Sequence, residues 1–325
     1  MIPPIKIGVA LGSGSARGWS HIGVLKELQA MGIEPHVVAG SSIGALVGAC
    51  YAADKLQALE DWVVGLGWRD VVSLLDVKFS GGLIEGRKVF QFFADNMPDL
   101  TFEQLTKSFA AVATDLESGR EIWLQHGQLA EAVRSSISLP GLFTPYRTRN
   151  GRYLVDGGLV NPVPVSLCRA MGADVVIAVN LNTEIVGKHM RSTRRVSEEF
   201  FEQEEQSPAA ESEDQKQIRL AESDFFKKVS QLFSDNASRD NGAAVETAPG
   251  MMEVVATSLN IMQDRITRSR MAGDPADLVL SPRLSHIGLM EFYRAEEAIA
   301  EGEKTVRLAQ HQLQNLLGDD FRALQ

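Results

Sequence analysis

The sequence predicts an α/β fold of three layers, in which a mainly parallel central sheet is flanked by helices. Two observations lead to this prediction. The first 53 residues alternate continuous apolar runs, typical of buried strands, with segments of helical periodicity. A nearly all-apolar run at 173–180 adds one more expected central strand. Because parallel strands need crossover connections, strands that alternate with helices indicate a parallel sheet covered by helices.

Local patterns define the individual elements. Ile22, Leu25 and Leu28 recur at helical spacing, and Gly32 stands where a helix commonly ends. The Glu117–Gly119 turn between two apolar runs predicts a hairpin. The expected strands are 5–11, 35–39, 109–114, 121–125, 173–180 and 277–281. The expected helices are 19–31, 43–53, 54–64, 86–96 and one or two helices within 287–317.

The domain organisation follows from length and composition. A chain of 325 residues with 44% hydrophobic composition can bury a large core, and we expect a single domain over 1–325. The span from about 186 to 250 is rich in acidic clusters and poor in large apolar residues, which predicts a mobile acidic insertion. Residues 215–233 within it have the pattern of an amphipathic helix. A sharper alternative is a lid, a partner-binding arm or a membrane-contact segment, whose apolar face would be Phe225, Phe226, Leu232 and Phe233.

Composition also argues against several classes of protein. The formal charge of -10 argues against general nucleic-acid binding, but it leaves transient contact with a membrane surface open. The two cysteines, Cys50 and Cys168, lack metal-ligand spacing and imply no disulfide framework, as expected in a reducing compartment. The first residues do not resemble a secretory signal, and the uncharged run Val37–Ala53 is short for a membrane span and broken by glycines. We therefore expect a cytoplasmic protein, which can be peripheral at the inner membrane face.

The first candidate motif is Gly40-Ser41-Ser42-Ile43-Gly44, which lies between an expected strand and an expected helix. A nucleophile elbow needs this context, because a serine in a tight strand–helix turn requires small residues two positions away. The positive end of the following helix would face Ser42 and favour the negative charge that develops in acyl transfer. The alternative is a packed turn without chemistry.

The second motif is the loop Gly12–Gly18, which also lies between a strand and a helix. A dinucleotide fingerprint that starts at Gly12 would need glycine where Arg17 stands, and a phosphate-binding P-loop would need Gly-Lys-Ser/Thr at its end. What remains is a loop of small residues with free backbone N–H groups, as an oxyanion hole requires. Arg17 would either brace the loop through carbonyl groups or bind a phosphate. The alternative is a tight turn that only permits close packing.

The third motif is Asp156-Gly157-Gly158, which follows a short apolar run. Taken alone, it is first of all a turn signal. It gains weight only in combination with the other two motifs.

Together the three segments resemble the patatin-like phospholipase family. The match runs over Leu11–Leu25, then Gly40-x-Ser42-x-Gly44, then Asp156-Gly-Gly158. Thr114-Asp115-Leu116-x-x-Gly119 and Ser135–Pro145 stand between them at similar positions. The resemblance covers about residues 5–182, resumes near 251–290, and is strongest to the small bacterial RssA-type members.

The resemblance implies a serine acyl hydrolase with a Ser–Asp dyad, in which Ser42 is the nucleophile and Asp156 the base. It also implies that the backbone N–H groups around Ser13, Gly14 and Ser15 bind the oxyanion. Ser13 and Ser15 replace glycines of the commoner loop, and serine tolerates a positive φ poorly. The implied substrate is a lipid or other ester, of phospholipase A, lysophospholipase or esterase type, and no metal or cofactor is implied.

Two other functional readings remain open at this stage. The chain order Ser42, Asp156, His286 is that of an α/β-hydrolase triad, although the elbow comes early for that fold. His21 follows the loop of the second motif and is expected to be structural. The second reading is a regulatory or scaffold protein that keeps the fold with little turnover. The sequence predicts neither the oligomeric state nor the acyl substrate.

Overall fold

The computed structural model describes residues 5–67, 87–183 and 251–318. The chain divides into two compact units, one of residues 1–188 with 261–325 and the other of residues 189–260. Within the second unit only residues 251–260 are described, and they form the first part of a helix. The predicted insertion at 186–250, with its helix and its phenylalanines, therefore lies outside the described residues.

The described strands form one mixed sheet, which is mostly parallel, as predicted. Its order is β5-β6-β3-β2-β1-β7-β8, and β4 pairs with β3 outside this path. The pairings of β1, β2, β3, β7 and β8 along the path are parallel, whereas β4, β5 and β6 pair antiparallel. The strands are β1 Ile7–Leu11, β2 Val37–Ser41, β3 Ser108–Asp115, β4 Glu121–Leu124, β5 Tyr146–Arg147, β6 Tyr153–Asp156, β7 Val175–Val179 and β8 Leu278–Leu280.

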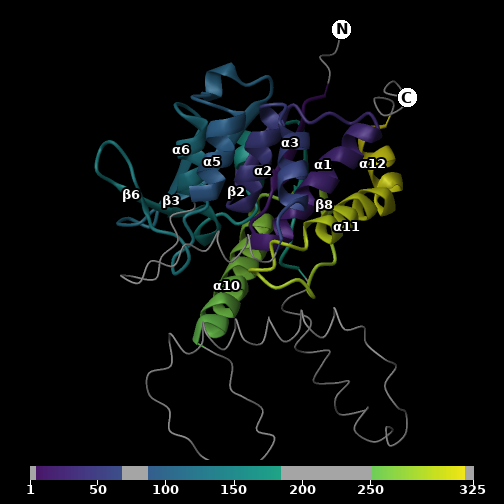
Figure 1. The fold of residues 1–325 in the computed structure, drawn as a ribbon. Coiled ribbons are helices and arrows are strands. Elements are labelled where there is room, and N and C mark those ends of the chain that lie inside the picture. The colour runs from purple at the N-terminus through teal and green to yellow at the C-terminus, as the bar shows by residue number, and fades with distance from the viewer. Residues whose placement is uncertain (1–4, 68–86, 184–250, 319–325) are drawn as a thin grey trace, which may run out of the picture. The chain divides into compact units, whose positions relative to one another are not determined.

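Helices cover both faces of this sheet and give the three layers (Figure 1). The α-helices are α1 Ser20–Ala30, α2 Ile43–Ala52, α3 Leu56–Val64, α5 Arg87–Asn96, α6 Leu129–Ser136, α7 Val165–Ala170, α10 Met251–Gly273, α11 Ala295–Leu308 and α12 Gln310–Leu317. Short 3-10 helices are η1 Ser15–Trp19, η2 Phe102–Gln104 and η3 Gly157–Leu159.

Alternation along the buried strands divides the core into two layers. Val9 and Leu11 of β1 join the larger cluster with α1, α2, α3 and α11, whereas Ala10 faces the smaller cluster with α7. Successive strand side chains point to opposite faces of a sheet, so a strand buried on both faces needs an unbroken apolar run. This is why the five residues of β1 are all apolar or glycine and are all buried.

Most expected elements are present, but α6, β5, β6 and α7, which lie between residues 129 and 170, have no counterpart among the expected elements. The one or two helices expected within 287–317 are α11 and α12, and the first of them begins at Ala295. The long helix α10 precedes β8 and has no counterpart among the expected elements. In the part of the chain that the structure describes, no helix is both long enough and apolar enough to span a bilayer.

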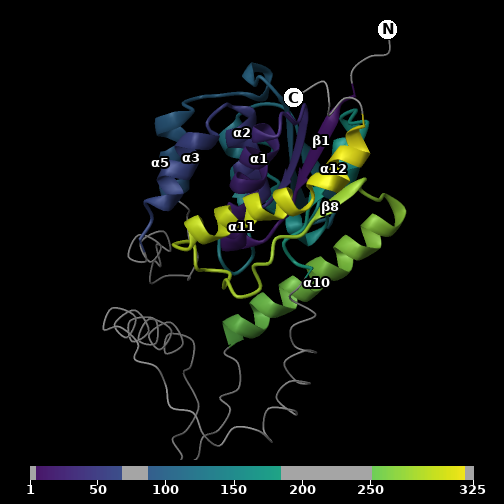
Figure 2. The ribbon, with the colours of Figure 1, turned by 90° about the vertical axis from the view of Figure 1, so that its right-hand side faces the viewer.

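The crossing of α1 and α11 depends on glycine. Figure 2 shows α11 lying across α1. A Cβ on Gly23 would lie 1.9 Å from the carbonyl oxygen of Ile299, and one on Gly302 would lie 2.1 Å from that of Ser20. Each glycine therefore allows one helix to touch the backbone of the other, and any larger residue must push the helices apart.

We expect Gly302→Ala to lower the free energy of unfolding by about 1–3 kcal/mol, because overpacking outweighs the gain of about 1 kcal/mol in helix propensity. Urea denaturation checks this value. Gly65→Ala is the matched control, since the nearest atom to its Cβ would be at an ordinary 3.4 Å. Equal stabilities of Gly302→Ala and the wild type would contradict the close contact.

Candidate active site

Ser42 occupies a strained turn between β2 and α2. Its φ of 56° and ψ of -125° lie outside the regions that a serine normally adopts. A Cβ on Gly40 would lie 2.5 Å from the Cα of Ala45, and one on Gly44 would lie 2.1 Å from the carbonyl oxygen of Leu11. The strand–turn–helix geometry of a nucleophile elbow is thus present, and both flanking glycines are required by close backbone contacts.

Two hydrogen bonds hold Ser42 in this conformation. Its backbone N–H donates to Oγ of Ser136 at 2.9 Å, and its own Oγ donates to Oδ2 of Asp156 at 2.5 Å. Ser136 ends α6, whereas Asp156 ends β6. Segments 94 and 114 residues further along the chain therefore fix the serine from two sides.

Asp156 is fully buried and satisfied on every side. Oδ1 accepts the backbone N–H of Gly158 at 2.7 Å, while Oδ2 accepts the Ser42 hydroxyl. Its backbone N–H donates to the carbonyl of Ser138, and its own carbonyl accepts the hydroxyl of Thr114. Hydrogen bonds therefore fix both the backbone and the carboxylate of Asp156.

The environment of Asp156 changes its acidity. Burial raises the pKa of this carboxyl from 3.8 to about 7, and the hydrogen bonds from Ser42 and Gly158 offset part of that rise. A carboxylate with a pKa near 7 is a much stronger proton acceptor than an exposed aspartate, and it is half ionised near neutral pH.

The glycine- and serine-rich loop follows β1 and leads into η1. The backbone N–H of Ser13 donates to the carbonyl of Pro162 at 2.9 Å, so it is not available as an oxyanion donor, in contrast to the expectation. Within the described residues, the backbone N–H groups of Gly14 and Ser15 have no hydrogen-bond acceptor. Ser15 has a φ of 49°, in the left-handed region that favours glycine.

Two buried side chains, Arg17 and His21, donate hydrogen bonds to carbonyl groups of this loop. Nε of Arg17 donates to the carbonyl of Gly14 at 3.3 Å, and one of its terminal nitrogens donates to that of Leu181. Burial lowers the pKa of Arg17 to about 10 and that of His21 to about 4. The neutral His21 donates from Nε2 to the carbonyl of Gly12 at 2.7 Å. Arg17 and His21 therefore both bind backbone carbonyl groups, as the bracing role of Arg17 and a structural role of His21 would require.

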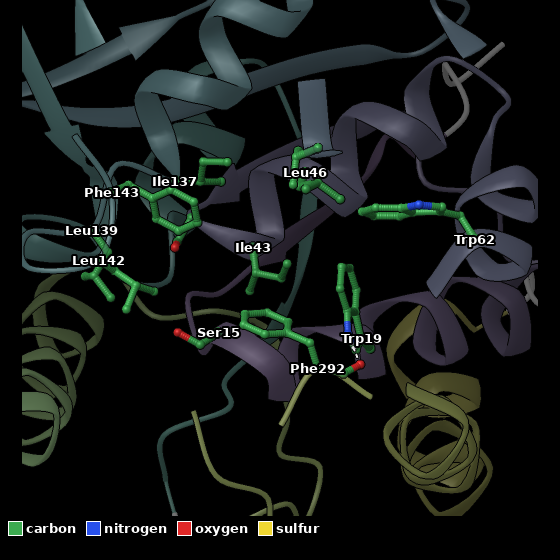
Figure 3. A pocket seen from close by; sticks show the side chains of 12 residues that line it. Ser15, Trp19, Ile43, Leu46, Trp62, Ile137, Leu139, Leu142, Phe143 and Phe292 are labelled. Carbon is green, nitrogen blue, oxygen red and sulfur yellow. Dashed lines mark hydrogen bonds between the residues drawn. The ribbon is translucent and has the colours of Figure 1, made fainter. Parts of the chain in front are cut away.

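A largely apolar pocket opens beside Ser42 (Figure 3). Trp19 and Phe292 form one wall, with ring centroids 5.9 Å apart, and Trp19 Nε1 donates to the Phe292 carbonyl. Ser15 and Ser42 are its hydroxyl-bearing residues. The remaining lining residues are Ile43, Leu46, Trp62, Val89, Ile137, Leu139, Leu142 and Phe143.

The alternative triad is not formed. Nε2 of His286 pairs with Oε1 of Glu297 at 2.6 Å, and both side chains are nearly half exposed. Asp156 contacts Ser42 directly, so no imidazole lies between the two. A triad requires the histidine to bridge the serine and the acid.

Sequence reasoning missed two residues at this site. Ser136, which fixes the Ser42 backbone, lies in a segment quoted for the family resemblance but had no role assigned. Gln263 of α10 accepts a hydrogen bond from Oγ of Ser13, and no local motif marks it. Only the three-dimensional contact identifies it.

The chain is similar to known proteins over most of its length. The family model described as patatin-like phospholipase matches residues 9–169. An uncharacterized NTE family protein of Mycobacterium tuberculosis is 33% identical over 321 residues, which cover 91% of this chain and 89% of that protein.

Other relatives match about half of the chain. Human patatin-like phospholipase domain-containing protein 6 is 32% identical over 55% of this chain and 13% of its own length. The neuropathy target esterase sws of Drosophila melanogaster is 33% identical over 55% of this chain and 13% of its own length. Among solved structures, VipD from Legionella pneumophila aligns over 98% of this chain and 77% of its own with 15% identity, but its TM-score of 0.45 supports no conclusion.

The buried carboxyl of Asp156 predicts a pH-dependent stability. The pKa of this group is raised from 3.8 to about 7. Its contribution to the free energy of unfolding is therefore complete below about pH 4 and is lost as the pH rises through about 7. We expect the free energy of unfolding of the wild type, minus that of Asp156→Asn, to fall by about 2.5 kcal/mol between pH 5 and pH 8. Urea denaturation at both pH values measures it, and a constant difference would rule out a raised pKa.

Proposed function

The chain belongs to the patatin-like phospholipase family, and we propose that it is a serine acyl hydrolase that cleaves lipid esters with a Ser42–Asp156 dyad. Family membership supports lipid hydrolysis in general. The finer proposal rests on one observation, the 2.5 Å hydrogen bond from the hydroxyl of a strained serine to a buried carboxylate. This pairing of a nucleophile with a proton acceptor is what acyl transfer through a covalent intermediate requires.

In the first half of the proposed reaction, Ser42 Oγ attacks the ester carbonyl carbon and its proton passes to Oδ2 of Asp156. The carbonyl oxygen becomes an oxyanion, and the N–H groups of Gly14 and Ser15 would donate to it. Each such donor contributes roughly 10²–10³-fold to the rate in serine hydrolases. The C–O bond of the ester then breaks, and the alcohol leaves with the proton from Asp156.

In the second half, water replaces the alcohol. Asp156 takes a proton from the water, whose oxygen attacks the acyl-Ser42 carbonyl carbon. The same N–H donors stabilise the second oxyanion, and collapse returns the proton to Ser42 Oγ as the fatty acid departs. These steps use only protein groups and water. Because the base must be ionised, the rate should rise as the pH rises through about 7.

The lining of the pocket supports an acyl chain as the part of the substrate that is bound. Aromatic and aliphatic side chains surround the space beside Ser42, and transfer of an alkyl chain from water contributes about 0.8 kcal/mol for each buried CH₂. Two relatives, a patatin-like phospholipase domain-containing protein and a neuropathy target esterase, carry names of ester hydrolases. We therefore propose a carboxylic ester hydrolase of phospholipase A, lysophospholipase or esterase type.

The dyad is tested with a fluorophosphonate probe and mapping of the adduct by mass spectrometry. We expect a single adduct on Ser42, its loss in Ser42→Ala, and labelling slowed by at least about 100-fold in Asp156→Asn, because general-base catalysis contributes about 10²–10⁴-fold.

His286→Ala is the control variant, since its pairing with Glu297 lies on a half-exposed surface, and it should be labelled at the wild-type rate. Loss of labelling in His286→Ala would favour the triad. A folded wild type that forms no adduct would favour the regulatory role.

We also propose that the protein is cytoplasmic and reaches its lipid by transient contact with the inner membrane face, since an ester of that kind lies at the bilayer surface. Cell fractionation should find it largely in the soluble fraction, with any membrane-bound part released by a salt or carbonate wash. A protein that resists both washes would refute this location.

A further inference from the structure

Gln263 lies on α10, outside the span that the family model matches, yet it touches the site. Its side chain is buried, with 6% exposure. Oε1 accepts two hydrogen bonds, from Oγ of Ser13 at 3.1 Å and from Nδ2 of Asn182 at 3.2 Å. One amide thus joins the glycine- and serine-rich loop to the segment that follows β7.

The other end of this amide meets the Asp156 turn. A Cβ on Gly158 would lie 2.6 Å from Nε2 of Gln263 and 2.9 Å from Oδ1 of Asp156. The amide nitrogen and the carboxylate oxygen are therefore at most about 5.5 Å apart. At that separation the positive end of an amide dipole favours the ionised form of a carboxyl group.

We propose that Gln263 is a positioning residue for the reaction. It fixes the loop that carries the Gly14 and Ser15 donors against the turn that carries Asp156, and it places its amide nitrogen beside the Asp156 carboxylate. The inference rests on the proposed Ser42–Asp156 dyad. It assigns to α10, the helix that runs toward β8 in Figure 2, a part in the geometry of the site.

The elements that Gln263 joins carry several charged groups, of which Arg270 on α10 pairs with Glu121 at 2.7 Å and Arg265 is exposed. Asp156 lies on the turn and Arg17 on η1, while the α10 neighbours Asp264 and Arg268 pair with each other at 2.8 Å. A new negative charge at position 263 would therefore act chiefly on Asp156, whose ionised form is a like charge.

Two variants separate positioning from charge. Gln263→Met keeps the size of the side chain but loses both acceptor bonds, and we expect kcat to fall about tenfold with KM changed less than about twofold. Gln263→Glu keeps the acceptor oxygen, replaces the amide nitrogen with a second oxygen and adds a charge. It should retain most activity at high pH but raise the apparent pKa of the pH–rate profile by about one unit above the wild type.

Thr267→Val is the matched control. Thr267 is equally buried one turn further along α10, and its hydroxyl has no hydrogen-bond partner among the described residues. Kinetics with a chromogenic acyl ester, probe labelling of Ser42 and thermal unfolding would be measured for all variants. Thr267→Val should match the wild type in kcat, KM and pH profile.

The outcomes separate the two claims. If both Gln263 variants lose only thermal stability and keep the kcat and pH profile of the wild type, the positioning role is overturned while the dyad stands. If the wild type neither labels nor hydrolyses the ester, the proposed function fails, and the inference fails with it. If Gln263→Met does not fold, the pH profile of Gln263→Glu alone decides, and an unshifted profile overturns the role.

Discussion

The site depends on a fully buried carboxylate that lies against the hydroxyl of a strained serine. An unpaired carboxylate would be very costly at this depth, so Asp156 must keep its hydrogen bonds from Ser42 and Gly158. Strand register creates the pairing. On β3, Val112 lies opposite Ser41 and Ala113 lies opposite Asp156, so adjacent residues of one strand set the separation of the serine elbow and the acid. The register of the sheet thus determines how far Ser42 lies from Asp156.

Glycine makes this arrangement sterically possible. A Cβ on Gly44 would meet the carbonyl of Leu11, and one on Gly157 would lie 2.2 Å from that of Val112. At both positions the turn touches the backbone of a strand, and no larger residue fits without displacing it. The positive φ of Ser42 costs on the order of 1–3 kcal/mol of conformational free energy. It persists because these backbone contacts prevent the turn from adopting another conformation.

This mixture of local and distant constraints explains what the sequence could predict. The elbow glycines are a local pattern and the buried strands are unbroken apolar runs, so the fold and the turn at Ser42 were predictable, whereas the role of Asp156 came only from the family resemblance. Helix α10 was missed because its buried side includes Gln263, Asp264 and Thr267, and these polar residues interrupt the apolar stripe that marks a helix. The hydrogen bond from the Ser13 N–H to the Pro162 carbonyl joins residues far apart in the sequence, so no local sequence pattern could predict it.

The serines that replace glycine in the loop illustrate the same point. An all-glycine loop can adopt the required conformation freely, but it also has many others, and fixing it costs conformational entropy. Here Ser15 adopts a positive φ at some cost, while the hydroxyl of Ser13 binds Gln263 and Arg17 holds the Gly14 carbonyl. The loop therefore owes its shape to contacts with its surroundings more than to its own freedom. A glycine at position 13 would remove the hydrogen bond to Gln263 of α10. The serine that departs from the family pattern is therefore the residue through which α10 contacts the loop.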